Sequence, residues 1–162
     1  MSLRRHAAVA HVSAPQSEVF AFLDEHALLA SHMEKRSLAM GGGSMRLEFD
    51  PDRGKAVGSK LRLSGTAFGL RLWVEEAVIE RIPPFRKVWE TVGEPRLLVI
   101  GPYRMGFVVE DLGRASQLTV FIDYQLPERA PWRWLGRPLG RWYARWCTER
   151  MTRDAERHFA PS

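Results

Sequence analysis

Cysteine is almost absent from this sequence, because the 162 residues contain only Cys147. A single cysteine cannot form an intramolecular disulfide, and no Cys/His spacing typical of zinc binding is present. A disulfide-stapled secreted scaffold and a zinc module are therefore excluded. We expect no metal site and no cofactor. One free thiol fits a reducing compartment, so we expect a cytoplasmic protein.

Long hydrophobic runs are also missing. The longest, such as residues 97–100, fall far short of the roughly 20 residues that cross a bilayer. Near the N-terminus, Arg4 and Arg5 precede an apolar stretch over residues 7–12, but His11 interrupts it. The stretch is shorter than the core of a signal peptide. We expect neither a membrane span nor a signal peptide.

Lysine is scarce, since only four of the 24 basic residues are Lys and the others are Arg. Against 19 acidic residues they give a formal net charge of +5. The whole excess lies in residues 129–157, where eight Arg face only Glu149, Asp154 and Glu156. A modest positive charge without a recognised nucleic-acid module is weak support for nucleic-acid binding, so we expect no such partner.

The length and composition predict one core. A chain of 162 residues, 45% of them hydrophobic, has enough apolar side chains for a single domain and no spare length for a second. We therefore predict one domain over residues 1–162.

The first part of the chain predicts a strand followed by two short helices. Residues 5–12 are expected to form the strand. Ser13 and Gln16 have the spacing of a capping box, which predicts a helix start directly after it. A second short helix is expected over residues 25–32, and the glycines at 41–43 end this region.

The period then changes from helical to alternating, which is typical of strands. Short turns rich in Gly and Pro separate the alternating runs, which lie at about 45–49, 60–65, from 70 toward Pro83, 88–92, 97–110 and 118–126. After the breaks at Pro131 and Pro138, residues 139–159 place apolar side chains near one side of a helix. The chain is expected to end on this long helix.

This order predicts an α+β fold, with a curved antiparallel sheet of about seven strands wrapped around the C-terminal helix. An antiparallel sheet with one apolar face needs a cover, and only the terminal helix is long enough to lie across it. A ligand pocket is expected between the two.

Several segments resemble the SRPBCC or START-like superfamily, which includes Bet v-type allergens, polyketide cyclases and lipid-transport proteins. These are APQSEVFAFL at 14–23, VIERIPP at 78–84 before a strand with Trp89, GFVVE at 106–110, and the terminal helix. The resemblance covers nearly the whole chain and implies the helix-grip fold. It implies a cavity for a hydrophobic guest and leaves the guest open.

The inward face of the strands and the terminal helix would line such a pocket. Strand parity nominates a mostly apolar ligand-binding set: Leu61, Leu63, Leu72, Val74, Trp89, Tyr103, Met105, Phe107, Val120, Ile122 and Tyr124. Trp142 and Trp146 join this set from one side of the terminal helix. Taken singly, each of these side chains could simply fill a core. As a group, aromatics and Met on a concave face suit an adaptable apolar site.

Three polar residues share parity with apolar neighbours and are candidates for catalysis: Glu76, Tyr103 and Tyr124. A half-buried phenol can bond a ligand carbonyl or donate a proton in a cyclisation, or it can bond the backbone. Glu76 could act as a general base if burial raised its pKa. Because buried carboxylates are rare, we favour a bulge between Val74 and Val78 that turns Glu76 outward.

Two histidines, His26 and His32, flank the opening that the two short helices would form. Neither has a carboxylate or cysteine partner in the sequence, so we interpret both as solvated residues at helix ends rather than as ligands or bases.

The C-terminal segment combines Arg at every fourth position with Trp residues. The arginines are Arg129, Arg133, Arg137, Arg141 and Arg145, and Trp132, Trp134, Trp142 and Trp146 lie among them. This composition is typical of an amphipathic segment that binds a surface. Against that reading, Pro131 and Pro138 should break the helix, Trp142 and Trp146 could pack on the sheet, and Arg stems often cover apolar surface without a partner.

Three hypotheses follow. The first is a carrier or binding protein for a lipid, a quinone or a polyketide-like compound. The second is a cyclase, aromatase or dehydratase that uses Glu76, Tyr103 or Tyr124. The third is a module that contacts an anionic membrane or an acidic protein through Arg133, Arg137, Arg141 and Arg145. The oligomeric state stays open.

Overall fold

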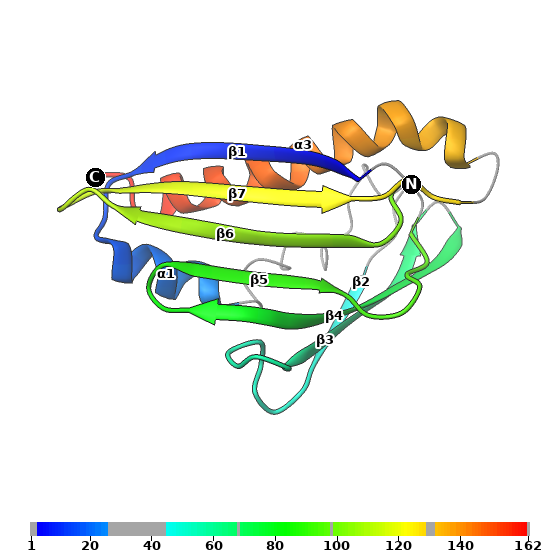
Figure 1. The fold of residues 1–162 in the computed structure, drawn as a ribbon, viewed down its shortest axis with the longest axis horizontal. Helices are drawn as coiled ribbons and strands as arrows, with labels where there is room; N and C mark the ends of the chain where they lie inside the picture. Colours follow the sequence, from blue (N-terminus) through cyan, green and yellow to red (C-terminus); the bar gives the residue numbers. More distant parts are fainter. Residues whose placement is uncertain (1–2, 26–44, 68, 98, 129–131, 162) are drawn as a thin grey trace.

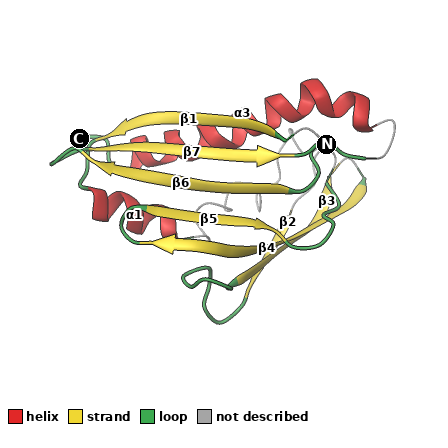
Figure 2. Cartoon of the chain, in the orientation of Figure 1, coloured by secondary structure: helices red, strands yellow, loops and turns green. Residues whose placement is uncertain are grey.

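The computed structural model describes residues 3–25, 45–67, 69–97, 99–128 and 132–161. These residues form one seven-stranded antiparallel sheet, in the order β1-β7-β6-β5-β4-β3-β2, and two helices (Figures 1 and 2). The strands are β1 (Arg4–Val12), β2 (Met45–Phe49), β3 (Lys60–Ala67), β4 (Leu70–Ile82), β5 (Arg86–Thr91), β6 (Tyr103–Asp111) and β7 (Ser116–Tyr124). The helices are α1 (Gln16–Asp24) and α3 (Trp132–His158).

The sheet joins the two ends of the chain. β1 pairs antiparallel with β7, from Arg4 opposite Tyr124 to Val12 opposite Ser116, and β1 and β2 are the two edge strands. In Figure 1, α3 runs behind β1 and β7, and α1 lies behind the left end of the sheet. This arrangement confirms the α+β class and the helix-grip fold. The second short helix was expected over residues 25–32, and all of these except Glu25 lie outside the described residues, as do the glycines at 41–43. The candidates His26 and His32 are among the residues outside.

The strands bury one face, as their alternation predicts. In β7, the inward residues from Ser116 to Tyr124 are each 2% exposed or less. They belong to, or lie beside, the main core cluster, which also contains residues of β1, β5 and β6, of α1, and of α3. The period-two pattern therefore positions the concave face on which the candidate site lies.

The strand expected from residue 97 begins later, at Tyr103. Pro102 has no N–H to donate to a strand ladder, which explains why regular pairing starts after it. The residues before it approach α3 instead, and the Gly101 N–H donates to the Gln125 carbonyl at 2.8 Å.

The first helix begins without the expected capping box. Pro15 occupies the N-cap position of α1, and no side chain caps the helix. The Gln16 amide instead donates to the Val109 carbonyl on β6 at 2.7 Å. The prediction of a Ser13/Gln16 capping box is therefore wrong, because Gln16 bonds to a distant strand rather than to its own helix end.

Helix α3 begins at Trp132, seven residues before the start at residue 139 that was expected for the terminal helix, and it continues through Pro138. Proline removes one N–H donor from a helix, and the carbonyl left without it belongs to Trp134, whose side chain is 81% exposed. Water can therefore bond that carbonyl. The expectation that Pro138 would break the helix is wrong.

Small residues bring α3 close to the end of the sheet. A Cβ atom added at Gly140 would lie 3.0 Å from the Val99 carbonyl oxygen and 3.3 Å from the Tyr124 ring. One turn earlier, a Cβ at Gly136 would lie 2.8 Å from Pro127. Together with the buried Ala144, these residues form the side of α3 that faces the sheet.

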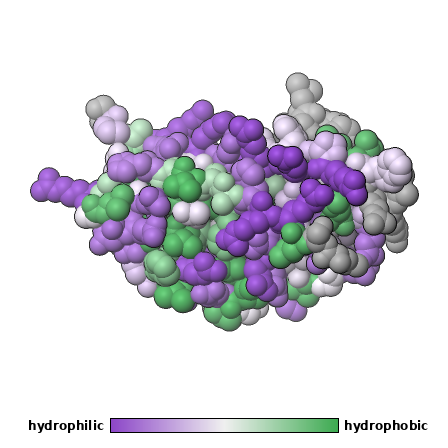
Figure 3. Space-filling view, turned by 45° about the horizontal axis from the view of Figure 1, so that its top comes forward, coloured by the Kyte–Doolittle hydropathy of each residue, from purple (hydrophilic) through white to green (hydrophobic). Residues whose placement is uncertain are grey.

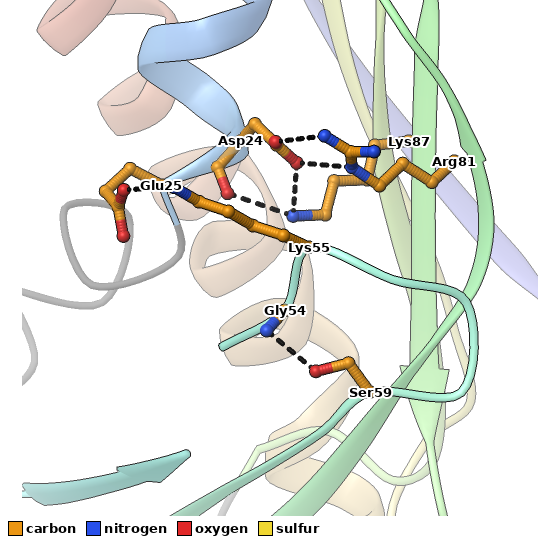
Figure 4. Close-up of polar contacts among 7 residues, drawn as sticks. All are labelled: Asp24, Glu25, Gly54, Lys55, Ser59, Arg81 and Lys87. Atoms are coloured by element: carbon orange, nitrogen blue, oxygen red, sulfur yellow. Dashed lines mark hydrogen bonds and ion pairs between the residues drawn. The ribbon is translucent and has the colours of Figure 1, made fainter. Parts of the chain in front are cut away.

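A buried ion network fixes the end of α1 to the sheet (Figure 4). The Lys87 ammonium, on β5, is 0% exposed and lies 2.9 Å from Oδ1 of Asp24, the last residue of α1. From β4, the Arg81 guanidinium binds both oxygens of the same carboxylate, at 3.1 and 2.7 Å. The neighbouring Glu25 pairs with Lys55 of the β2–β3 connection at 2.9 Å.

The charged groups in this network stabilise one another's ionised forms. Burial by itself would raise the pKa of Asp24, but the hydrogen bonds and charges of Arg81 and Lys87 outweigh it and hold the pKa below its ordinary value. Burial lowers the pKa of Lys87, and Asp24 opposes that shift. The sequence analysis missed this network, although Lys87 shares strand parity with Trp89 and so had the pattern of an inward residue.

Replacing Asp24 by Ala should destabilise the protein by about 3–5 kcal/mol, because it removes the carboxylate that pairs with the buried Lys87 ammonium and with Arg81. Urea unfolding measures the effect. Glu75→Ala is the control, since Glu75 pairs with the exposed Lys60 and Arg62 and should cost less than about 1 kcal/mol. The double variant Asp24→Leu/Lys87→Met should recover most of the lost stability. Similar losses in Asp24→Ala and Glu75→Ala would contradict the role given to the network.

Candidate functional site

A carboxyl group lies buried on the concave face of the sheet. Glu76, on β4, is 6% exposed, and the Tyr103 hydroxyl, on β6, donates a hydrogen bond to its Oε1. The expected bulge between Val74 and Val78 is absent, because the register shift of β4 lies between Val78 and Glu80. Glu76 therefore keeps the inward parity of its neighbours, and the prediction that it points outward is wrong.

Two side chains of α3 complete a polar cluster with this pair. Tyr143 and Cys147 lie one turn apart on the helix, and each contributes to the pKa shift of the other. The negative charge of Glu76 contributes to raising the pKa values of Tyr103, Tyr143 and Cys147, so all four groups lie within electrostatic range of one another. We call Glu76, Tyr103, Tyr143 and Cys147 the polar cluster.

Burial dominates the acid–base properties of the polar cluster. It raises the pKa of Glu76 from 4.5 to about 7, with the Tyr103 hydrogen bond as a smaller opposing effect. Burial likewise raises the pKa values of Tyr103 and Tyr143 well above the ordinary range, and that of Cys147 to about 12. Near neutral pH, Glu76 therefore changes charge while its three neighbours stay protonated.

The polar cluster lies where two apolar clusters meet. The larger contains Trp89, Met105 and Phe107, and the smaller contains Leu63 and Val74. Tyr103 packs against both. The cluster is thus surrounded by hydrocarbon side chains, which explains the strong desolvation of Glu76.

Most of the predicted ligand-binding residues face this region. Those that are buried are Leu61, Leu63, Val74, Trp89, Met105, Phe107, Val120, Ile122 and Tyr124, and those that are half-buried are Leu72, Tyr103 and Trp146. Trp142 differs, since it is 53% exposed and stacks on Trp146 with ring centroids 6.4 Å apart. The expectation that Trp142 packs on the sheet is not met, because Gly140, Ala144 and Cys147 occupy the inner side of α3.

Tyr124 does not join the polar cluster. It is the cross-strand neighbour of Tyr103. Burial raises the pKa of Tyr124, and the charges that oppose this shift are those of Arg4 and Arg141. Glu76 does not contribute to the shift.

Sequence reasoning missed Tyr143 and Cys147. Their spacing of four residues on a helix was available, but which side of α3 faces Glu76 depends on the packing of that helix.

Among the described residues, no three His, Cys, Asp or Glu side chains are grouped so that they could hold a metal ion. The described helices also contain none that is long and apolar enough to span a membrane.

Two surface grooves are lined by described residues. One, of about 670 Å³, runs between β1 and α3, and the other, of about 350 Å³, lies beside Pro102 and Tyr103.

The raised pKa of Glu76 predicts a pH-dependent stability. Because the folded state binds the proton more tightly than the unfolded state, the free energy of unfolding should fall as pH rises from 4.5 toward 7, by up to about 3 kcal/mol. Glu76→Gln has no proton to lose, so its stability relative to the wild type should increase between about pH 5 and about pH 8. Urea unfolding at both pH values measures this. Glu75→Gln, the outward neighbour, is the control, and a difference between Glu76→Gln and wild type that stays constant with pH would contradict the assignment.

No protein-family model and no curated protein matches this chain. Solved structures do. The Zhui aromatase/cyclase from Streptomyces sp. R1128 has a TM-score of 0.69 at 13% identity, over 96% of this chain and 95% of that one. Norcoclaurine synthase from Thalictrum flavum, in complex with dopamine and hydroxybenzaldehyde, has a TM-score of 0.64 at 13% identity, over 99% and 90%. Ara h 8.0201, a Bet v1-like allergen, has a TM-score of 0.60 at 10% identity, over 95% and 98%. The chain therefore has the helix-grip fold of these proteins, the fold of the SRPBCC or START-like superfamily that its sequence resembles.

Proposed function

We propose that this protein binds a hydrophobic small molecule between the concave face of the sheet and α3, with Glu76 and Tyr103 bonding a carbonyl or hydroxyl group on it. The guest would be a lipid, a quinone or a polyketide-like compound. The observation that supports this most is the buried Glu76–Tyr103 pair at the junction of two apolar clusters.

The pair is costly for folding alone. A carboxyl group buried among hydrocarbon loses its hydration, and similar-sized apolar residues would often stabilise a core at least as well. In binding sites, by contrast, a few polar groups in an apolar lining fix the orientation of the guest. The placement of Glu76 fits the second role better than the first.

The chemistry of the pair suits an oxygen-bearing guest. Below its pKa of about 7, the Glu76 carboxyl can donate a hydrogen bond to a carbonyl, and above it the carboxylate can only accept one. Tyr103 stays protonated and can both donate and accept. The neighbours of similar fold include a synthase solved with two small aromatic molecules, which supports a small-molecule guest for this fold.

Native mass spectrometry and titration with a naphthoquinone and with a hydrocarbon of similar size test this function. We expect Tyr103→Phe to weaken quinone binding about tenfold, the value of one hydrogen bond to a buried partner, and to leave hydrocarbon binding unchanged. Raising the pH from about 5.5 to about 8.5 should weaken quinone binding to the wild type by a similar factor, because the Glu76 carboxyl loses the proton that it donates. The pH change should not weaken binding to Glu76→Gln, whose amide can donate at both pH values. Glu75→Gln, the same substitution one residue away on the outer face, should bind both as the wild type does. Uptake of neither compound would contradict the proposal.

A second candidate function is proton-transfer catalysis of the cyclase, aromatase or dehydratase kind. The observation that favours it is the Glu76 pKa of about 7, which lets one carboxyl serve as base or acid near neutral pH. Tyr103, hydrogen-bonded to it, could donate a proton to a developing oxyanion.

A Kemp elimination of 5-nitrobenzisoxazole reports on a buried carboxylate base. We expect turnover to rise with pH through about 7 and to be lost in Glu76→Gln but not in Glu75→Gln. Tyr103→Phe should shift the pH midpoint, because the hydrogen bond that opposes the burial effect is removed. Turnover that does not depend on Glu76 would rule out this catalytic role.

A further inference from the structure

The first half of α3 carries basic side chains without acidic partners. Between Trp132 and Thr148 the sequence contains no Asp or Glu. Arg137 and Arg141 are exposed, and neither forms an ion pair with any residue that the structure describes. Arg145, one turn later, pairs with Glu149 at 2.8 Å. The uncompensated charge therefore lies on the first half of the helix. The side chain of Arg133, predicted to belong to this group, lies outside the described side chains.

Large apolar side chains are exposed on the same half of α3. Leu135, Leu139 and Trp142 follow one another at spacings of four and three residues and are 45%, 41% and 53% exposed. Trp134 is 81% exposed. Residues at this spacing lie along one side of a helix, so the three form a continuous stripe and not scattered single residues. Exposed apolar surface of this kind marks an interaction site.

The packing of α3 explains why these residues face solvent. Gly136, Gly140 and Ala144 occupy the side that touches the sheet, so the residues on the opposite side of the helix must point away from it. In Figure 1, the N-terminal half of α3 extends above the β1 edge of the sheet, while its C-terminal half passes behind the strands. Figure 3 turns this side forward and shows strongly hydrophilic side chains beside weakly polar and hydrophobic ones.

We propose that this surface, made of Trp134, Leu135, Arg137, Leu139, Arg141 and Trp142, binds the surface of an anionic lipid bilayer. Exposed Trp and Leu on a helix favour the boundary between headgroups and acyl chains, and Arg favours the lipid phosphates. Unpaired arginines are attracted to a negatively charged membrane surface. A bilayer is deformable, so it can accommodate a convex helix that carries both Arg and Trp. A folded acidic protein would instead need a pocket that matches the shape of this helix.

The groove beside α3 adds room for headgroups at this surface. Its wall on α3 includes Arg141, Trp142 and Arg145 and, farther along the helix, Glu149 and Glu156, and its wall on β1 includes His6 and Val9. The end of the groove beside Arg141 and Trp142 is therefore the part that suits a phosphate headgroup. The basic surface and the groove therefore lie side by side. This interaction is independent of the guest proposed for the interior, because none of the polar cluster residues lines the groove.

Flotation with vesicles of phosphatidylcholine, with and without phosphatidylserine, tests the proposal on the full chain. We expect binding to the phosphatidylserine vesicles at low salt and weaker binding at high salt. Arg137→Gln/Arg141→Gln should weaken it about thirtyfold, from about a fivefold contribution of each arginine near the surface. Trp134→Ala/Trp142→Ala keeps the charge and should weaken binding about tenfold.

Arg114→Gln/Arg157→Gln is the matched control. It removes the same charge from two exposed residues, in the β6–β7 turn and at the far end of α3, about 30 Å along the helix from Arg137. This variant should weaken binding less than about threefold. All substituted residues are exposed, and circular dichroism and urea unfolding confirm that each variant folds.

Three outcomes would overturn the proposal. The first is no binding to phosphatidylserine vesicles. The second is an equal loss of binding in the Arg137/Arg141 and Arg114/Arg157 variants. The third is binding to polyglutamate in solution without binding to vesicles, which would point to an acidic protein partner. Uptake of lipid into the interior would give vesicle binding that none of these surface variants changes, and so it is distinguishable from the proposed contact.

Discussion

The close approach of α3 to the sheet is the constraint on which both proposed sites depend. Gly136 and Gly140 leave no side chain between the helix and the Val99 carbonyl or Pro127, so the helix can lie with only one side inward. Because an α-helix turns by about 100° per residue, this choice fixes the direction of every other side chain on it. Tyr143 and Cys147 then face Glu76, and Trp134 and Trp142 face solvent.

The interior contains two kinds of buried charge with different consequences. Asp24, Lys87 and Arg81 compensate one another, and the hydrogen bonds of the group join α1 to both β4 and β5. Glu76 bonds to the Tyr103 phenol and, among the residues that the structure describes, pairs with no cation, so burial raises its pKa to about 7. The first group stabilises the attachment of a helix. The second leaves a group that can change charge near neutral pH within an apolar surrounding, which is a property of sites rather than of cores.

Much of the fold could be predicted because strand alternation is a local property. Leu118 and Val120 alternate with the polar Gln117 and Thr119, and their inward direction follows from the period of a strand. The same strand alternation nominated Glu76 and Tyr103 as inward residues. The prediction for Glu76 was then wrong because a bulge was assumed to turn its side chain outward. The position of a bulge depends on how two strands pair, and β4 and β5 shift register between Val78 and Glu80, beyond the assumed interval from Val74 to Val78. Lys87 was missed for a related reason, since only the docking of α1 supplies its partner Asp24.

The sequence by itself determined the succession of strands along the chain, the presence of the terminal helix and the location of the excess positive charge. Each of these follows from local periodicity or from a count of residues. Tertiary structure alone decided which side of α3 faces inward, and hence that Trp142 is exposed while Cys147 is buried. It also decided that Glu76 and Tyr103 meet, although they lie 27 positions apart on strands separated in the sheet by β5. Such contacts depend on backbone approach and strand register, which are properties of the assembled sheet and helix and of no single segment.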